Sequence, residues 1–536
     1  MRALDEPPPA TVPPPARDGG RREDALWATI GAASAALVFL LVRGSLIDDA
    51  YITLSYARNL AEHLHWGLTP FRTANSATSP LNVLVLGAAA FVVRDAVWGL
   101  GLVLVLLTAL QGWGLSRLAR GLGLGRATAP LALFMVLLSP LMLSIVGMEM
   151  TLAATLLVWL TVAAVEGRAV AFGLLATALV LTRIDLTVFP LVLLLIAPAV
   201  RRRAGRVLLV SVGSALPWFV FSWLALGAIV PDTLVIKTVT TSSWGPWSFG
   251  NGPQLYLETY RAATLLTAVP VLLGVLALLG WAATGGWRRP AWHGLGPVVG
   301  LGLAGVLHYL AYTLLAPPPY HWYYAPSVVA LTLVAAVAAG TPGRVTARPV
   351  RDAAGLTDDG PRDQPGGGAT STLPVRRRLT PVGLLAAVVG LLVLTADVGY
   401  ALQRPLPWDQ TPITTNWATA AQYQVAGEEL REIAGDQVVS SPGEIGTLAY
   451  YCRCDIVDLF ADPGTLQPVI DQREAEAGSV MRRLLQLNFA RRAAVPAAQP
   501  TLAVIWETGP AAADAPWPVA SNWRGPGALD VVPAAP

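Results

Sequence analysis

The stretch LIDDAYITLSYARNLAEHLHWG, residues 46–67, follows the first long apolar run of the chain, and the rest of the sequence is interpreted from it. Asp48 and Asp49 stand side by side where that run ends. The residues after them have a helical period, with one face carrying Arg58 and Glu62. An aspartate is also a favoured helix N-cap, but capping needs only one of the pair. The two carboxylates therefore mark a candidate site at a membrane surface.

The composition places the chain among membrane proteins. Of its 536 residues, 54% are hydrophobic and 13% are charged, whereas soluble proteins carry about 25% charged residues. Apolar runs predict a polytopic α-helical protein with about eleven transmembrane helices, near 25–47, 97–116, 127–146, 150–165, 169–183, 186–200, 207–229, 261–284, 295–316, 322–340 and 380–400. The apolar run 80–93 is too short to span and predicts an interfacial or re-entrant helix.

Arginine placement predicts the orientation. If 80–93 does not span, the arginine-rich loops and the N-terminus fall on one side, which the positive-inside rule makes cytoplasmic. We therefore expect a multi-pass membrane protein with the Asp48–Asp49 pair on the extracytoplasmic face. Lys237 is the only lysine among 37 basic residues, a bias that suggests a GC-rich bacterial genome and hence a bacterial plasma membrane.

Composition also predicts the domain organisation. Residues 1–24 are rich in proline and charge and predict a disordered cytoplasmic tail. Residues 25–400 form the transmembrane domain, in which 48–95 is the first external loop with juxtamembrane helices and 341–378 is a disordered cytoplasmic loop. Residues 401–536 contain short apolar runs between turn residues and predict a small extracytoplasmic α/β domain. The runs are Gln437–Val439, Asp455–Phe460 and Thr501–Trp506.

The only two cysteines, Cys452 and Cys454, lie in this exported domain, where oxidation is permitted. Their spacing leaves both a disulfide and a pair of free thiols open.

Ionisable and aromatic residues from five separate loops gather on the predicted external face. They are Asp48, Asp49, Arg58, Glu149, Arg183, Asp185, Lys237, His321 and Tyr323. Each has a structural alternative: Glu149 suits a helix N-terminus, Arg183 and Asp185 could pair with each other, and the aromatic run suits a membrane interface. Ionisable groups near a membrane are costly, so their convergence on one face favours a functional site.

Several motifs resemble one family in the same order along the chain. They are DDAYITLSYARNLA from residue 48, TSPLNVLVLGAAA from 78, GMEMT from 147, LTRIDL from 181, GAIVPDTLVIK from 227 and SPGEIGTLAYYCRCDIVDLFADPG from 441. These resemble the GT-C glycosyltransferases, membrane enzymes with polyprenyl-phosphate sugar donors. The likeness is greatest to the actinobacterial terminal arabinofuranosyltransferases of cell-wall arabinan.

The resemblance implies a transferase that moves a sugar, expected to be arabinofuranose, from a polyprenyl-phosphate donor. The acceptor would be a cell-wall polysaccharide or a lipid-linked glycan, with membrane lipids as surroundings and no nucleic acid partner. Two alternatives are a polyprenyl-phosphate-mannose-type transferase and a lipid or glycan transporter (flippase). The lack of an internal repeat and the gathering of charges at one face favour the enzyme over a transporter.

The resemblance and the chemistry of transfer assign roles to the candidate residues. Asp48 and Asp49 are the expected catalytic carboxylates, with Asp48 ranked first, because a like-charged neighbour raises the pKa of a carboxyl toward that of a general base. Cations for the donor phosphate would be Arg58, Arg183 and Lys237. Substrate-binding candidates are Tyr51, Trp66, Glu149, Asp185, His321 and Tyr323. If the reaction uses a divalent cation such as Mg²⁺, Mn²⁺ or Ca²⁺, the expected ligands are Asp48, Asp49 and Glu149.

Overall fold

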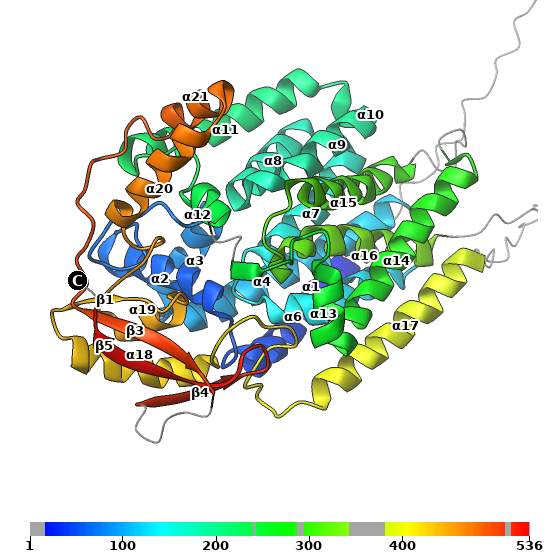
Figure 1. Ribbon diagram of the computed structural model, residues 1–536. Helices are drawn as coiled ribbons and strands as arrows, with labels where there is room; N and C mark the ends of the chain where they lie inside the picture. The colour runs from blue at the N-terminus through cyan, green and yellow to red at the C-terminus, as the bar shows by residue number, and fades with distance from the viewer. Residues whose placement is uncertain (1–16, 240–242, 287–293, 342–380, 510–515, 535–536) are drawn as a thin grey trace, which may run out of the picture.

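The computed structural model describes residues 17–239, 243–286, 294–341, 381–509 and 516–534. It is a bundle of helices with a small sheet at one edge (Figure 1). Almost all of the predicted cytoplasmic loop 341–378, and the first 16 residues of the predicted tail, lie outside the described residues.

Seven helical segments are long and apolar enough to cross a membrane, among the described residues. They belong to α1 (Arg17–Val42), α4 (Ala96–Gly121), α11 (Ala204–Ala225), α14 (Arg261–Ala283), α15 (Gly296–Leu315), η5 with α16 (His321–Tyr324 and Ala325–Gly340) and α17 (Pro381–Leu402). The polytopic helical fold predicted from the sequence is therefore confirmed.

The other predicted spans are shorter helices, so helix length alone does not reproduce the count of eleven. They are α5 (Thr128–Leu137), α6 (Pro140–Ser144), α7 (Met150–Glu166), α8 (Ala169–Thr182), η1 (Ile184–Thr187), α9 (Val188–Ile196) and α10 (Pro198–Arg201). The run predicted at 127–146 is divided between α5 and α6, because Pro140 cannot continue the hydrogen-bond ladder of α5. At the other end of the bundle, α1 begins at Arg17, ahead of the predicted Ala25, and its Asp24 pairs with Arg120 of α4.

The predicted short helix forms as α3 (Pro80–Val93), with the proline at its first turn, where the missing N–H costs nothing. It packs against α2 (Asp48–His63), the amphipathic helix that begins with the aspartate pair. Neither aspartate caps α2, whose N-cap residue is Ile47 and which has no side-chain cap.

The C-terminal region contains a five-stranded mixed sheet in the order β2-β1-β3-β5-β4. Its strands are β1 (Val438–Ser440), β2 (Asp455–Val457), β3 (Leu502–Thr508), β4 (Trp517–Ser521) and β5 (Gly525–Pro533). The first three strands pair in parallel, and β5 joins β3 and β4 antiparallel. The helices of this region are α18 (Ala420–Ala434), α19 (Gly446–Cys452), α20 (Pro463–Glu476) and α21 (Ser479–Asn488).

The C-terminal region is packed onto the membrane bundle at two places. Residues of α2 and the first loop, including Tyr56 and Trp66, share an apolar cluster with Tyr423 of α18 and Leu448 of α19. Further along, α20 contacts α12 (Thr233–Val239), and Figure 1 shows α20 and α21 beside α11 and α12. The sheet itself lies away from the bundle's centre, so its helices make the contacts that bear on the site.

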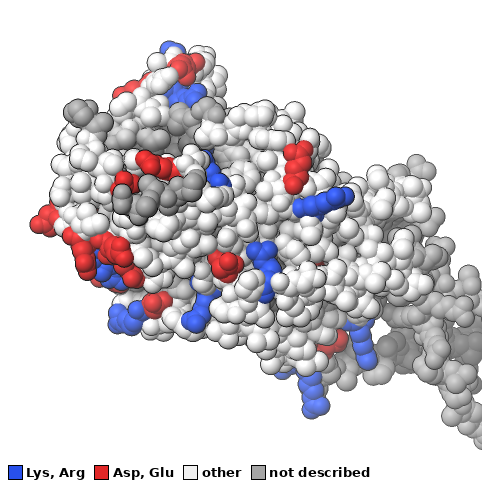
Figure 2. All heavy atoms as spheres, turned by 60° about the horizontal axis from the view of Figure 1, so that its bottom comes forward, with Lys and Arg blue, Asp and Glu red and all other residues white. Residues whose placement is uncertain are grey.

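Charged side chains are sparse over the face drawn in Figure 2, where they form small separate groups on a mostly uncharged surface.

Cys452 and Cys454 form a disulfide at the end of α19. The sequence left both a disulfide and two free thiols open, and the structure contains the disulfide.

Candidate functional site

Asp48 joins the start of α2 to the start of α19. Its carboxylate accepts hydrogen bonds from the backbone amides of Gly446 at 3.0 Å and Thr447 at 2.7 Å. At the other end of α19, the Arg58 guanidinium donates to the carbonyl of Tyr450 at 2.5 Å. A negative group at a helix N-terminus and a positive group at its C-terminus both favour the helix dipole. Asp48 and Arg58 thus hold α19 parallel to α2.

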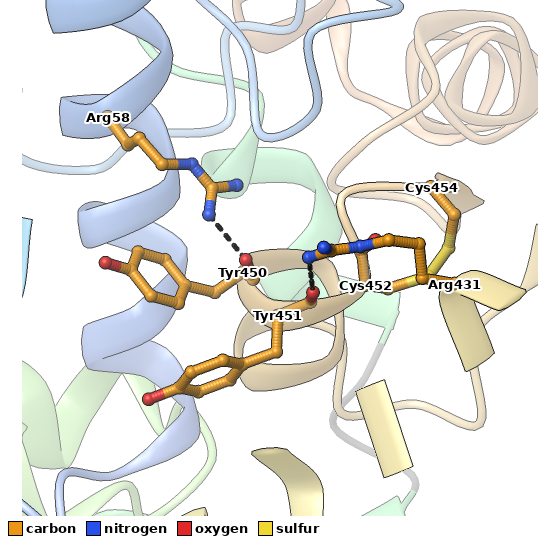
Figure 3. The surroundings of a disulfide bond; sticks show 6 residues. All are labelled: Arg58, Arg431, Tyr450, Tyr451, Cys452 and Cys454. Atoms are coloured by element: carbon orange, nitrogen blue, oxygen red, sulfur yellow. Dashed lines mark hydrogen bonds between the residues drawn. A yellow bond between two sulfur atoms is a disulfide. The ribbon is translucent and has the colours of Figure 1, made fainter. Parts of the chain in front are cut away.

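Tyr51 belongs to the same face of α2, two turns before Arg58. Its ring lies 5.3 Å from that of Tyr450 and 5.6 Å from that of Tyr451, between centroids. Figure 3 shows Arg58 reaching from α2 toward the end of α19, and Arg431 bound to its last carbonyls. The predicted substrate-binding role of Tyr51 and the phosphate-binding role of Arg58 therefore stay predictions, because the structure places both side chains at the junction with α19.

Trp66, another predicted substrate-binding residue, is buried in the first loop. Its ring packs 5.6 Å from Tyr56 and 5.1 Å from Trp218. These contacts give it a packing position, away from the cavity described next.

Asp49 faces in a different direction from Asp48, into a polar cavity. The cavity is lined by side chains from seven separate parts of the chain: Asp49, Ile52 and Thr53 of α2, residues 76–79 before α3, Met148 and Glu149 before α7, Arg183 after α8, Thr233 and Lys237 of α12, Trp322 of η5, and Phe460. The convergence expected from the external loops is found here for Asp49, Glu149, Arg183 and Lys237.

Arg183 is the centre of a buried network at the base of this cavity. Its guanidinium donates to Glu149 at 2.9 Å, to Asp185 at 2.9 Å and to the hydroxyl of Tyr312 at 3.0 Å. Asp185 also accepts from Tyr312 at 2.8 Å and lies 3.2 Å from the Nε2 atom of His308. Each guanidinium nitrogen has a partner, so Arg183 positions Glu149 rather than offering an unengaged charge to a ligand.

The two α15 residues in that network, His308 and Tyr312, were not among the sequence candidates. Their signal was present, because two polar groups four residues apart in an apolar helix share one face and are costly in a membrane unless partnered. The structural alternative for Arg183 and Asp185 is also correct, since they do pair with each other. The alternative for Glu149 is correct for its position, since Glu149 is the N-cap residue of α7, but its side chain makes no capping hydrogen bond and bonds to Arg183.

Lys237 approaches the cavity from α12 against an aromatic wall. Its ammonium lies 4.8 Å from the ring centroid of Tyr323 and 5.8 Å from that of Tyr320, distances at which a ring face attracts a cation. Tyr323 also lies under Arg183, at 5.2 Å. The predicted residue Tyr323 is therefore next to the cavity, and Tyr320 is an additional member that the sequence reading missed.

The surroundings of Asp49 in the cavity give its carboxyl group a higher pKa than that of an ordinary aspartate. Burial raises the pKa of Asp49 to about 7; Lys237 opposes that shift, and Asp48 and Glu149 reinforce it. Burial likewise lowers the pKa of Lys237; Arg183 lowers it further and Asp49 opposes. A carboxyl group whose pKa lies near neutrality is suited to exchange protons with a substrate hydroxyl.

His321 lies on the other side of η5 from the polar cavity. It lines a separate, wholly apolar cavity of about 330 Å³ with Tyr256 and Tyr324, while its neighbour Trp322 lines the polar one. A 3₁₀-helix turns about 120° per residue, so adjacent side chains point to different sides. The structure thus does not bring His321 to the other predicted site residues, and it supplies Trp322 in its place.

The residues expected to hold a divalent cation do not fit one. Both carboxylate oxygens of Asp48 accept backbone amides of α19, and Glu149 faces a guanidinium. Over the described part of the chain, no group of three histidine, cysteine or carboxylate side chains is arranged to hold a metal.

Comparisons with known proteins rest on structure alone, because no protein-family model and no curated protein sequence matches the chain. ArnT from Cupriavidus metallidurans, in a crystal structure bound to undecaprenyl phosphate, is similar with a TM-score of 0.54 and 14% identity, covering 96% of this chain and 99% of that one. The arabinofuranosyltransferase AftD from Mycobacteria gives a TM-score of 0.42 and 13% identity, covering 95% of this chain and 40% of that one.

At such identities, similarity to a solved structure speaks for the fold and not for the activity. The ArnT similarity extends over nearly the whole of both chains, including the C-terminal sheet region. The chain therefore has the fold of the GT-C membrane proteins, with a small mixed α/β region at its C-terminus.

Proposed function

We propose that the protein is a glycosyltransferase that moves a sugar from a polyprenyl-phosphate donor to a glycan acceptor on the outer face of the membrane. The observation that carries this proposal is the pairing, in one cavity, of a carboxyl group whose pKa is near 7 with a lysine ammonium. Transfer from a lipid phosphate needs those two groups, a base for the acceptor and a cation for the leaving phosphate.

In the proposed reaction, the Asp49 carboxylate takes the proton of an acceptor hydroxyl. The hydroxyl oxygen forms a bond to the anomeric carbon of the donor sugar as the bond from that carbon to the phosphate oxygen breaks. The electron pair leaves with the polyprenyl phosphate, whose charge Lys237 stabilises. Arg183 holds Glu149 at the cavity and so acts as a positioning residue.

The geometry supports the opposite ranking of the two aspartates from the one expected from the sequence. Asp48 has both oxygens occupied by α19, whereas Asp49 lines the cavity with Lys237. We therefore assign the general base to Asp49, and to Asp48 the docking of the C-terminal region beside the cavity.

Two further considerations support the class of substrate. The similar ArnT structure is bound to undecaprenyl phosphate, which supports a lipid-linked donor for a protein of this fold. For the sugar, the proposal is arabinofuranose and the acceptor a cell-wall glycan; these rest on the likeness of the DDAYITLSYARNLA and GMEMT motifs to the arabinofuranosyltransferases.

The test is isotopic transfer by the purified chain in proteoliposomes. Polyprenyl-phosphate arabinofuranose, labelled in the sugar, should pass label to an arabinan oligosaccharide, and polyprenyl-phosphate mannose should pass none. Label transferred only from the mannose donor would replace the proposed sugar and keep the reaction class. A folded protein that transfers label from neither donor to arabinan or mannan acceptors would overturn the proposal.

A further inference from the structure

A second polar cavity lies on the opposite side of α2 from Asp49. It has a volume of about 80 Å³, and it is enclosed by α2, the end of α3, the start of α4 and the end of α19. Arg58, which lines it, follows Asp49 by nine residues. Nine residues turn a helix by about 900° and advance it by about 13 Å, so the two side chains lie on opposite faces. This cavity is therefore separate from the proposed transfer site.

The lining of this second cavity has an excess of positive charge. Three guanidinium groups, those of Arg58, Arg94 and Arg453, face two carboxylates, Glu62 and Asp95. Within the described ranges, none of the three arginines lies within 4.0 Å of a carboxylate oxygen. Each of the two carboxylates has a different partner: Glu62 lies beside His63, and Asp95 accepts a backbone amide of α4.

Glu62 lies 3.7 Å from the ring of His63, and Asp95 caps α4 by accepting the amide of Trp98 at 2.8 Å. External loops of membrane proteins tend to be poor in basic residues. Three arginines drawn from α2, the α3–α4 turn and the C-terminal region therefore make an unusual convergence on this side.

Arg58 is the buried member of the cluster. Its side chain is only 5% exposed, and its guanidinium stacks 4.4 Å from the ring of Tyr450 while one nitrogen donates to the Tyr450 carbonyl. Burial lowers the pKa of Arg58 and the nearby Arg453 lowers it further, whereas Tyr450 and Glu62 oppose that shift. A buried cation beside a second cation is costly, and an anion between the two offsets that cost through charge-assisted hydrogen bonds.

The rim of the cavity is apolar on the side of α3. Phe91 and Val92 are 54% and 73% exposed, and Arg94 lies over the Phe91 ring at 4.7 Å. α3 itself is a 14-residue apolar helix, too short to cross a bilayer. Exposed apolar side chains next to arginines are typical of a helix lying at the level of lipid headgroups.

The third arginine is fixed by the C-terminal region. Arg453 stands in the sequence between Cys452 and Cys454, which form a disulfide at the end of α19. Figure 3 shows that disulfide. The backbone of Arg453 has a φ of 53°, so it ends the helix as a left-handed C-cap, and its side chain lines the cavity. The cluster thus unites a membrane-facing helix with the C-terminal region.

We propose that this cavity binds the phosphate group of an anionic phospholipid, with Arg58, Arg94 and Arg453 as its cations and Phe91 and Val92 against the acyl chains. The cavity holds several water molecules' worth of space, enough for a phosphate group but not for a sugar chain. A phosphate shared by Arg94 and Arg453 would tie the C-terminal region to the membrane surface. This proposal does not depend on the transfer activity.

The test measures lipid binding to the purified full chain in neutral detergent. Native mass spectrometry would count retained phosphatidylglycerol and phosphatidylcholine, and thermal unfolding would give apparent affinities for each lipid. Wild type should prefer phosphatidylglycerol. The double variant Arg94→Gln/Arg453→Gln should bind it at least about ten-fold more weakly, since each change removes one charge-assisted contact.

The matched control is Arg43→Gln. Arg43 is also exposed, and it lies 4.9 Å over the Trp98 ring at the same end of α4, but it does not line the cavity. The control should bind phosphatidylglycerol like wild type. Should the double variant fail to fold, the single exposed change Arg94→Gln decides, with an intermediate loss expected.

Three results would overturn the proposal. One is equal retention of the two lipids by wild type, and another is an unchanged affinity in the Arg94→Gln variant. The third is inorganic phosphate giving the same stabilisation at the same concentration and displacing the lipid, which would assign the cavity to a soluble anion instead.

Discussion

Replacing Asp48 by asparagine should loosen α19 from α2. The carboxylate accepts two backbone amides, at 3.0 and 2.7 Å, whereas an asparagine side chain has only one acceptor oxygen. One buried amide N–H would lose its partner, at a cost of about 1–3 kcal/mol. Loss of the negative charge at the start of α19 adds about 0.3–1 kcal/mol. Together these give a destabilisation of about 1–4 kcal/mol for the docked helix, with a midpoint of about 2.5 kcal/mol.

The assay is amide hydrogen exchange over residues 441–452, measured by mass spectrometry on the protein in detergent. A change of that size should speed exchange of the Gly446 and Thr447 amides by a factor on the order of a hundred. The isosteric neighbour Asp49→Asn is the matched control, because Asp49 lines the cavity instead of bonding to α19, and it should leave exchange unchanged. Wild-type exchange in Asp48→Asn, or equal acceleration in both variants, would refute the docking role.

Three other outcomes are expected. Lys237→Ala should raise the KM for the lipid donor far more than that for the acceptor, and Lys237→Arg should rescue only partly, because a planar guanidinium replaces a point charge; equal effects on both substrates would exclude a phosphate role. Arg183→Leu should lower stability by about 3–5 kcal/mol in thermal unfolding, since Glu149 and Asp185 would stay buried without their cation; an unchanged midpoint would contradict this. Reporter fusions at Gly366 and Gly435 should report opposite compartments, and a shared compartment would refute the predicted topology.

Much of the fold could be predicted, because the apolar runs that become helices and strands are local features of the sequence. The limits of α3 coincide with the short apolar run 80–93, and the apolar runs near 438, 455 and 502 became β1, β2 and β3. The strands β4 and β5 were not predicted, because proline and glycine interrupt their apolar pattern. β5 pairs with β3, and β4 pairs with β5. The helix limits within 127–146 depended on a single proline.

The functional assignment of adjacent residues could not be predicted in the same way. Asp48 and Asp49 are neighbours, yet a helix separates their directions by about 100°, and which one faces the cavity depends on where α19 docks. The amide that binds Asp48 lies 398 positions later in the chain. The same holds for His321 and Trp322, which η5 directs into different cavities. The helical period shows which residues share one face of a helix. Which segment packs against that face is decided by the tertiary structure.

The central claim is that Asp49 acts as the general base of sugar transfer, and its pH dependence tests this most directly. Because the pKa of Asp49 is raised to about 7, the carboxylate is protonated and inactive at lower pH, and it becomes available as the pH rises through that value. Single-turnover transfer from a labelled polyprenyl-phosphate sugar should therefore increase with pH and level off above about 8, while Asp49→Asn should stay at least about a hundred-fold below that plateau and lose the rise with pH. A wild-type rate that is flat from about pH 5 to 9, or an Asp49→Asn variant with the wild-type rate, would contradict the account.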